Sequence, residues 1–477
     1  MFATAIRQLG YAWTMMSGRR FRLRDVTALV DDLRETLETF GSPGEGAGDM
    51  LAGQDPEIQD DLTRRRLRRT VRHAAGETPF YRALFREHGI DPGSVTPETF
   101  AAVPPTRKQD LRGTPAAFVS DQARPTLLAQ TTGTTGTPTL VWFSAYEIEL
   151  MAAMAALAQM LTGGVRSHHI WANAINSRSV AQIIAERSVT RTGAAFVQLG
   201  TIDADTALDR LATPLHVPGK EPQITHLNVT ASYLAALVQA AERGGWTARD
   251  FRLTEIWSGG EVLTDALRRR AEEAFGATVI DGYSMTEIAP VTGQVCPDGH
   301  LHLPTDQGLV EVLDPVTFEP AAPGALGTLV VTPYSTYRDT TLLLRYVTGD
   351  LVRALREDER PGCALAATPA TSRLLGRAGP GGVTTRDVLD LLQAEPALPL
   401  PTRHALDDGL LYVVAGGAAA GDRSALLARL EERAEGLPLT GIVLVETPDE
   451  LPHPCRVRAD LLEHGFERAT PTLTGTR

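Results

Sequence analysis

Threonine and glycine gather in one short stretch, Gln130–Thr139, which reads QTTGTTGTPT. Gly133 and Gly136 let the backbone curl, so N–H groups and hydroxyls can be presented together to an anion such as a phosphate. The stretch is not the phosphate loop GxxxxGK[ST], because no lysine follows the second glycine. Taken alone, it is also compatible with a threonine/glycine surface turn.

Acidic and aromatic residues recur in two segments further along the chain. Asp281–Glu287 reads DGYSMTE and Tyr346–Asp350 reads YVTGD. With the threonine/glycine stretch, these segments resemble the motifs of the adenylate-forming enzymes, although Ser284 stands where those enzymes usually have glycine. Three more segments resemble the phenylacetate–coenzyme A ligase branch of that family: Thr78–Tyr81, Pro104–Arg112 and His302–Pro315.

The resemblance implies a site that binds ATP, Mg²⁺ and a carboxylic acid. Thr286 would hydrogen-bond the α-phosphate, and Glu287 would bind Mg²⁺ through hard carboxylate oxygens. The β- and γ-phosphates would be held by the threonine/glycine loop: Thr131, Thr132, Gly133, Thr134, Thr135 and Gly136. The base and ribose would be bound by a second set: Gly259, Gly260, Glu261, Asp281, Tyr283, Ser284, Asp350 and Arg377.

Two residues of this second set have specific implied roles. Asp350 has two acceptor oxygens that suit the two ribose hydroxyls. Tyr283 would stack on the purine, which lies flat where glycines carry no side chain. Purely structural interpretations remain open for both: an aspartate in a turn after glycine, and a core aromatic residue at a strand end.

The C-terminal part departs from the family pattern. Gly376 and Arg377 are followed by glycine-rich chain that lacks the two aspartates usual at this hinge, and no lysine occurs after Lys220. The family places a catalytic lysine near the C-terminus, and Arg456 stands at the matching position here. We expect Arg456 to supply the catalytic cation; Arg377 is the other candidate, and an ordinary exposed arginine is the alternative for Arg456.

The elements that must position these residues follow an α/β pattern. From about residue 126, strand-like and helix-like segments alternate, which predicts a largely parallel sheet. Thr230 and Thr264 are predicted N-caps of two helices, each of which follows a predicted strand. Residues 308–353 are β-rich pieces separated by proline and glycine, which predicts a smaller β-subdomain.

Three parts of the chain are expected from these patterns. Residues 1–60 form an N-terminal helical extension, residues 61–375 a large multi-layer adenylation domain, and residues 376–477 a small, mobile α+β C-terminal domain. The overall fold class is α/β.

Composition limits the partners. The net charge of −12 gives no global field that would attract nucleic acid or an anionic membrane. The arginine-rich run 64–72 is a local exception and predicts a helix with a solvated basic face. The most apolar segment, 148–164, contains Glu149 and is too short to span a bilayer, so a cytoplasmic protein is expected.

The cysteines are few and widely spaced, so no disulfide framework is indicated. Cys296, His300 and His302 lie close in sequence, but no fourth ligand is visible, and a zinc site is left open.

The resemblance implies an AMP-forming acid ligase that activates a small carboxylic acid, aryl or otherwise apolar, through an acyl-adenylate. Residues 166–230 and the segment after Glu287 would line the acyl pocket. Coenzyme A is the usual acceptor, whereas an amine or a carrier-protein thiol is compatible with the same adenylate. The alternative is a degenerate protein that binds a nucleotide or acyl ligand without turnover, which the missing lysine and aspartates favour.

Overall fold

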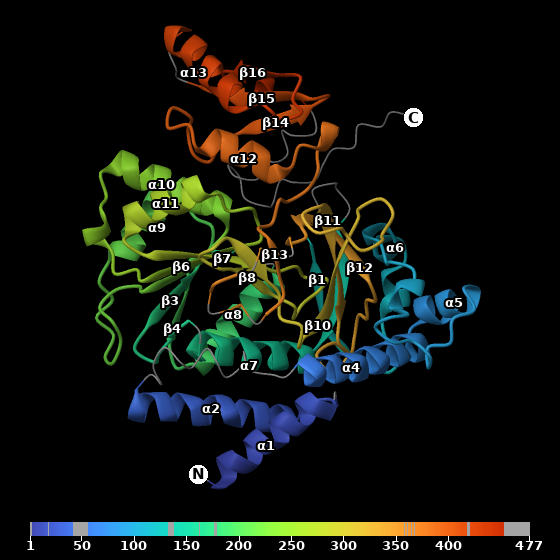
Figure 1. Ribbon diagram of the computed structural model, residues 1–477. Helices are drawn as coiled ribbons and strands as arrows, with labels where there is room; N and C mark the ends of the chain where they lie inside the picture. The colour runs from blue at the N-terminus through green and yellow to red at the C-terminus, as the bar shows by residue number, and fades with distance from the viewer. Residues whose placement is uncertain are drawn as a thin grey trace.

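The structure is a computed structural model. It describes residues 2–17, 19–41, 56–131, 138–161, 163–175, 179–356, 358–359, 361–363, 365–366, 368–416 and 420–452. Its centre is an eight-stranded sheet with the strand order β13-β9-β8-β7-β6-β5-β3-β4 (Figure 1). These strands are β3 (Ile170–Asn173), β4 (Ala195–Gln198), β5 (His226–Val229), β6 (Glu255–Gly259), β7 (Thr278–Tyr283), β8 (Gly293–Val295), β9 (His300–His302) and β13 (Ala370–Ser372). The strands from β3 to β7 are parallel, whereas β8, β9 and β13 add an antiparallel edge.

Helices cover both faces of this sheet. On β3, Ile170 and Ala172 belong to the core beneath one helical layer, and Trp171 packs on the opposite face with Val189. This alternation follows from the period of two along a strand, and it explains why the parallel strands are apolar on both faces. The covering helices are α7 (Ala145–Leu161), α8 (Val180–Arg191), α9 (Ala204–Ala212), α10 (Ala231–Gly244) and α11 (Asp265–Phe275). The α/β fold predicted from the sequence is confirmed.

The predicted helix caps also form. The Thr230 side chain accepts a hydrogen bond from the Tyr233 N–H at the start of α10, and Gly245 ends that helix in a left-handed conformation. Thr264 caps α11 in the same way, accepting from the Leu267 N–H. Each cap satisfies one backbone donor that the first helical turn leaves unpaired, so the helices begin where the sequence predicts.

The β-rich segment forms a separate antiparallel sheet. Its strands are β10 (Gly308–Leu313), β11 (Leu326–Pro333) and β12 (Tyr346–Arg353), in that order across the sheet. A separate two-stranded ribbon is made of β1 (Pro125–Gln130) and β2 (Leu140–Ser144), and Trp142 of β2 exchanges hydrogen bonds with Thr341 in the chain before β12. β1 ends at Gln130, the first residue of the threonine/glycine stretch, and β2 begins just after the stretch.

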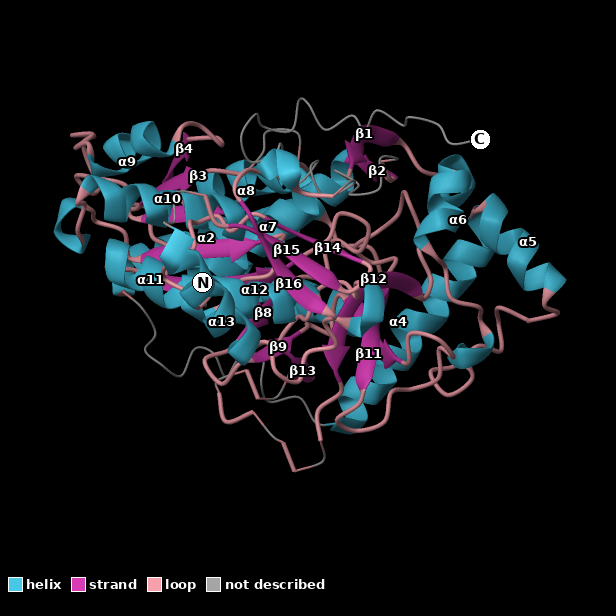
Figure 2. Cartoon of the chain, turned by 90° about the horizontal axis from the view of Figure 1, so that it is seen from above, coloured by secondary structure: helices cyan, strands magenta, loops and turns pink. Residues whose placement is uncertain are grey.

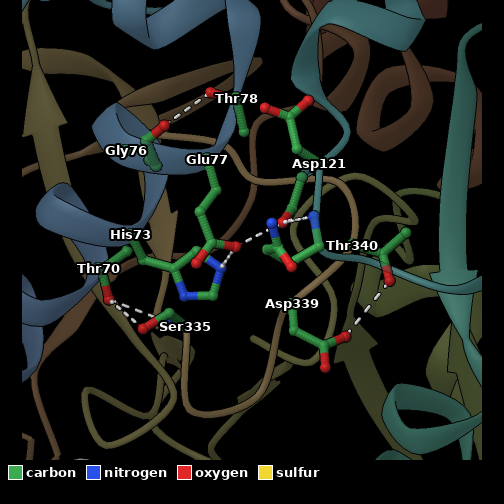
Figure 3. A network of polar contacts seen from close by, with 12 residues as sticks. Thr70, His73, Gly76, Glu77, Thr78, Asp121, Ser335, Asp339 and Thr340 are labelled. Carbon is green, nitrogen blue, oxygen red and sulfur yellow. Dashed lines mark hydrogen bonds and ion pairs between the residues drawn. The ribbon is translucent and has the colours of Figure 1, made fainter.

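The chain between β11 and β12 is fixed by buried polar contacts. Glu147, with its side chain fully buried on α7, accepts from the Asp339 and Thr340 N–H groups and pairs with Arg338 at 3.2 Å. On the other side, Thr70 of α4 (Pro56–Glu77) accepts from the Ser335 N–H at 2.9 Å (Figure 3). Since β12 follows directly, these contacts set where β12 begins.

The N-terminal helices pack on the domain that follows them. α1 (Phe2–Ser17) and α2 (Leu23–Phe40) lie below α7 in Figure 1, and the apolar stripe of α2, Val26, Val30 and Leu37, is buried in the main core. Among the residues that the structure describes, the α-helices between α2 and β1 are α4, α5 (Pro79–Glu87) and α6 (Lys108–Gly113).

The C-terminal part has its own small core. Its elements are α12 (Thr385–Gln393), β14 (His404–Asp407), β15 (Leu410–Val414), α13 (Ala420–Arg433) and β16 (Gly441–Val445). They lie over the region between the two larger sheets (Figures 1 and 2). Arg386 on α12 attaches this part to the main body by donating to the Leu374 and Leu263 carbonyls at 2.6 and 3.1 Å. The boundary predicted at 375/376 stays a prediction.

The arginine-rich run is helical and largely solvated, as the sequence predicts, but it has one exception. Most of its arginines are exposed on α4, but Arg66 is buried and donates to the Asp306 carbonyl at 3.0 Å. The fully solvated basic face is therefore interrupted. Within the described residues, the helices all fall short of the length and apolar character that a membrane crossing requires.

Candidate active site

The carboxyl ends of β6 and β7 bring two predicted site segments together. Gly259 and Gly282 are paired across these strands, and a side chain at Gly259 would press against the Gly282 carbonyl. Gly260 follows with φ +81°, a conformation that favours glycine. Glu261 then accepts from the Ser232 N–H at 2.7 Å, at the start of α10. In open parallel sheets, ligands bind outside these strand ends.

Asp350 lies in a charged and aromatic setting. The Arg377 Nε lies 2.8 Å from Asp350 Oδ1, and the Tyr283 hydroxyl donates to Oδ2 at 2.9 Å. Burial raises the pKa of Asp350, and the Arg377 charge opposes this rise. A turn aspartate exposed to solvent would have none of these partners, so the turn interpretation does not describe Asp350.

The Tyr283 side chain is more buried than stacking on a purine would require. Its ring is buried in the main core, and only its hydroxyl reaches Asp350. The structure therefore shows Tyr283 as a hydrogen-bond donor to Asp350. Stacking on a purine would require neighbouring residues to move, and this role stays a prediction.

Glu287 is a carboxylate with almost no solvent contact, at 1% exposure. Its Oε1 lies 3.1 Å from the Lys108 Nζ and accepts from the Tyr346 hydroxyl at 3.3 Å. Burial and the nearby Glu287 charge raise the pKa of Tyr346, so this phenol stays a hydrogen-bond donor. Lys108 and Tyr346 come from segments distant in sequence and converge on one carboxylate.

Helix α6 links Glu287 to the base of the threonine/glycine loop. Lys108 is its first residue, and Arg112, one turn later, donates through Nε to Thr139 Oγ1 at 3.1 Å. Thr139 in turn closes the loop: the Thr131 N–H donates to its carbonyl, and its own N–H donates to Thr131 Oγ1. The loop therefore starts and ends close to the helix that carries Lys108.

The start of α6 is itself fixed against β12. Thr106 donates its N–H to the Arg345 carbonyl, and the Val347 N–H donates to the Thr106 carbonyl, both at 2.9 Å. The Thr106 hydroxyl also donates to the Leu344 carbonyl at 2.8 Å. Tyr346, which contacts Glu287, and Asp350 are both on β12. The pairing of Thr106 with β12 therefore places Lys108 near the carboxylates of Glu287 and Asp350.

The predicted metal ligand fits a hard cation. Among the described residues, Glu287 Oε2 is buried without a hydrogen-bond partner. An unpaired buried carboxylate oxygen is costly unless something binds it, and carboxylate oxygen is the ligand that Mg²⁺ prefers. Glu287 would thus hold Mg²⁺ through Oε2, and the metal role remains a proposal.

A cleft of about 380 Å³ opens beside these groups. Its charged lining residues are all basic, Arg107, Lys108 and Arg377, and its floor is the start of β12 at Val347–Gly349. Gly349, at φ +75°, lies against the Arg377 guanidinium, where a side chain would collide. The concentration of positive charge suits a phosphate-bearing ligand.

The remaining predicted residues lie around this arrangement. Asp281 ends up on β7 beside Ser258, and Ser284 and Thr286 follow β7 in the turn that leads to Glu287. Burial raises the pKa of Asp281 to about 7, against the opposing charges of Arg386, Arg373 and Arg268. Asp281 is therefore a poor permanent anion, and its implied contact with the nucleotide stays a prediction.

Several predictions fall outside the described residues. These are Thr132, Gly133, Thr134, Thr135, Gly136 and Arg456. Their implied roles remain predictions.

The acyl-pocket prediction is only partly compatible with the structure. His169 directly precedes β3, at the amino end of the parallel strands and thus opposite Gly259 and Tyr283. Val291, after Glu287, is buried in the core. The early part of the 166–230 region is therefore remote from the cleft.

One residue was missed by sequence reasoning. Lys108 lies in the family-like segment Pro104–Arg112 and is one of two lysines available to a mechanism, but the sequence prediction assigns it no role and places the catalytic cation at Arg456 or Arg377. The available signal was its rarity, since the chain has two lysines, Lys108 and Lys220.

Comparisons with known proteins identify the family of the chain. Residues 60–338 match the family model of the AMP-binding enzymes. The phenylacetate–coenzyme A ligase of Pseudomonas putida is 31% identical over 308 residues, which are 62% of this chain and 66% of the relative. The enzyme of the same name from Thermus thermophilus is 28% identical over 302 residues, 61% of this chain and 64% of the relative. The match thus covers slightly less than two thirds of either relative.

Solved structures match over more of the chain. A 2-hydroxyisobutyryl-CoA ligase in the postadenylation state, in complex with R3-HIB-AMP, superposes with a TM-score of 0.71 over 89% of this chain and 97% of that chain, at 20% identity. The open conformation of that ligase, in complex with 2-HIB-AMP and CoA, superposes with a TM-score of 0.63. The superposition covers 86% of this chain and 93% of that chain, at 21% identity. At such identities the likeness establishes the fold. By the family match, the chain belongs to the AMP-binding enzymes, and among them it is similar to the phenylacetate–coenzyme A ligases.

Proposed function

We propose that the chain is an AMP-forming acid ligase. It activates a small carboxylic acid with ATP as an acyl-adenylate and then passes the acyl group to coenzyme A. The proposal rests on one observation. Two ion pairs, Glu287–Lys108 and Asp350–Arg377, lie next to β12, and Lys108 and Arg377 both line the same basic cleft. A nucleotide that spans both pairs has its ribose at Asp350 and its phosphates toward Lys108.

The proposed first step joins two anions. A carboxylate oxygen of the acid attacks the α-phosphorus of ATP, a P–O bond forms to the acid, and the bond to the β-phosphate breaks as pyrophosphate leaves. The protein's part is to position the anions and to offset their repulsion. Mg²⁺ held by Glu287 would neutralise phosphate charge, and Thr286 would donate a hydrogen bond to the α-phosphate.

Lys108 is the proposed cation at the reacting end. In the ligand-free arrangement its ammonium neutralises Glu287. With a divalent cation on Glu287, that pairing is no longer needed, and a flexible ammonium can turn to a phosphate or carboxylate oxygen. Lys108 then supplies from α6 the charge that the family supplies from a C-terminal lysine, and Arg456 is the rival source.

The proposed second step is attack of the coenzyme A thiol on the adenylate carbonyl, which releases AMP. Support comes from the relatives, whose names specify phenylacetate and coenzyme A, and from the coenzyme A present in a structural neighbour. An aryl or other apolar acid is proposed on the same ground.

Acid-dependent exchange of labelled pyrophosphate into ATP tests the first step. We expect exchange with at least one acid of an aryl, arylacetic and short aliphatic panel, and its loss in Glu287→Gln. The control is Glu98→Gln, because Glu98 is exposed and its ion pair is with Arg64 of α4, which does not line the basic cleft. Nucleotide binding without exchange for any acid contradicts the proposal and favours a binding protein.

The acceptor is tested separately. The adenylate formed from the best acid is offered coenzyme A or a primary amine. Rapid discharge by coenzyme A supports the thioester step, whereas discharge by the amine alone contradicts it and leaves the first step standing.

A further inference from the structure

Helix α1 carries a row of apolar side chains on its outer side. Ile6, Leu9, Trp13 and Met16 are 55, 70, 61 and 46% exposed. Their spacing of three, four and three residues places them on one face of the helix, and we call them the outer stripe. Single exposed apolar side chains are ordinary on a protein surface, whereas a continuous row of them indicates an interaction surface.

The opposite face of α1 is held against the rest of the protein. The Tyr11 ring stacks on Phe21 with centroids 5.4 Å apart, and the Tyr11 hydroxyl lies 3.8 Å from Met154 Sδ. Arg7, one turn before Tyr11, pairs with Asp32 of α2 at 2.8 Å. These contacts fix the roll of α1 about its axis, so the outer stripe faces away from the protein at the bottom of Figure 1.

Positive charge gathers where α1 turns into α2. Residues 1–24 contain five arginines and no acidic residue. Arg20 is used within the chain, because it pairs with Asp339 at 2.8 Å. Three other arginines of this turn are exposed and form what we call the basic corner: Arg19, Arg22 and Arg24.

Negative charge gathers toward the other end of α2. Asp31, Glu35 and Glu38 are exposed, and their spacing of four and three residues places them on one face, which we call the acidic row. Asp31 also pairs with Arg34 at 3.1 Å, so the net negative charge of the row lies at Glu35 and Glu38. The two charged groups therefore mark opposite ends of the helix pair.

This surface is complementary to itself. At 1.5 Å per residue, the outer stripe is about 15 Å long, and Arg22 and Glu35 are about 20 Å apart along α2. In a two-fold dimer, each copy presents the same patch to the other. A two-fold axis through the middle of the outer stripe brings the basic corner of each copy toward the acidic row of the other copy.

An anionic lipid surface is the rival occupant. It would suit the outer stripe and the basic corner, but it would repel Glu35 and Glu38 on the neighbouring helix. A second copy uses all three groups, so the distribution of charge favours it. The family match begins at residue 60, and the residues that line the basic cleft all lie outside α1 and α2. Association through these helices is thus separate from acid activation.

We propose that two copies of the chain associate through α1 and α2, with the outer stripes packed together and each basic corner against the acidic row of the other copy. Specific interfaces of standard size bury about 800 Å² per partner. A contact made by two short helices is at the small end of this range, so the dimer should form reversibly as protein concentration rises.

Sedimentation velocity of the full-length protein over a wide range of concentration tests the outer stripe. We expect a reversible dimer for the wild type. Leu9→Glu and Trp13→Glu should each raise the dissociation constant by about tenfold or more, because the two-fold axis buries each substituted position twice. Val217→Glu is the matched control, since Val217 is 44% exposed in a loop outside α1 and α2. It should dimerise as the wild type does.

Reversal of the charges tests which groups meet. Arg19→Glu with Arg22→Glu should weaken the dimer, and so should Glu35→Arg with Glu38→Arg, because each pair of changes sets like charges against each other. All four changes together should restore it, which neither a folding defect nor a lipid surface can explain. Circular dichroism checks that each variant is folded.

Three results overturn the proposal. The first is a wild type that stays monomeric at every concentration; sedimentation of that monomer with phosphatidylglycerol vesicles would assign the outer stripe to lipid instead. The second is a dimer that is unaffected by Leu9→Glu and Trp13→Glu. The third is a fourfold charge reversal that stays as weak as the two double reversals.

Discussion

Replacing Lys108 by methionine tests the proposed catalytic cation. Lys108 is 26% exposed and Glu287 1%, so their 3.1 Å contact is only partly screened by solvent. At an effective dielectric constant of about 20, unit charges at this distance interact by about 5 kcal/mol before desolvation is counted. In the reaction, a charge-assisted hydrogen bond to phosphate of about 1.5 to 3 kcal/mol would be lost. Pyrophosphate exchange should therefore slow by about 10- to 150-fold.

The second lysine is a matched control. Lys220 donates to the Ser167 and Gly193 carbonyls at 2.6 and 2.7 Å and does not line the basic cleft. Lys220→Met should lower the melting temperature and leave exchange in the folded protein unchanged. If Lys108→Met keeps wild-type exchange while Arg456→Ala loses it, the cation comes from the C-terminus and our reasoning is refuted.

The rarity of lysine allows an independent readout. Acylation of side-chain amines followed by peptide mass spectrometry reports on Lys108 and Lys220 separately. Bound ATP with Mg²⁺ should protect Lys108 and leave Lys220 unprotected. Equal labelling with and without nucleotide contradicts the placement of phosphates beside α6.

Further predictions concern the two carboxylates on β-strands and the buried ion pair. Asp350→Asn should raise the KM for ATP about tenfold or more, because a hydrogen bond to a charged group is worth about 1.5 to 3 kcal/mol; a KM within twofold of wild type in ATP titrations of exchange contradicts a ribose contact. Burial raises the pKa of Asp281 from 3.8 to about 7. Between these two pH values the folded state keeps a proton that the unfolded state has released, so the free energy of unfolding should fall as pH rises through this range. The urea midpoint of Asp281→Asn should lack this decline, and parallel pH profiles for variant and wild type would refute it. Glu147→Ala leaves Arg338 buried without its charge partner and should cost about 3 to 5 kcal/mol in urea unfolding, whereas Arg243→Ala, in an exposed pair, should cost less than about 1 kcal/mol.

Local features of the fold are predictable from the sequence. Thr230 and Thr264 cap helices through contacts within three residues, and the glycine at position 245 ends α10. The signal for such contacts is contained in a few adjacent residues. The β-subdomain is predictable for the same reason, since its strands are separated by proline and glycine.

Contacts between distant segments are not predictable in this way. Lys108 reaches Glu287 because Thr106 pairs with β12, and Cys363 reaches His302 because β13 pairs with β9. In both cases, the residues near each strand do not reveal with which distant segment, or in which register, the strand pairs. Arg66 shows the same limit, because its burial depends on the position of Asp306 rather than on its own helix.

The most direct test of acid activation follows oxygen from the acid. With a carboxylate labelled with ¹⁸O on both oxygens, attack on the α-phosphorus leaves one labelled oxygen on AMP after the acyl group has been transferred to coenzyme A. Mass spectrometry of the products should find the label in AMP and in the thioester. Label in inorganic phosphate with formation of ADP would indicate an acyl phosphate and would contradict an AMP-forming ligase.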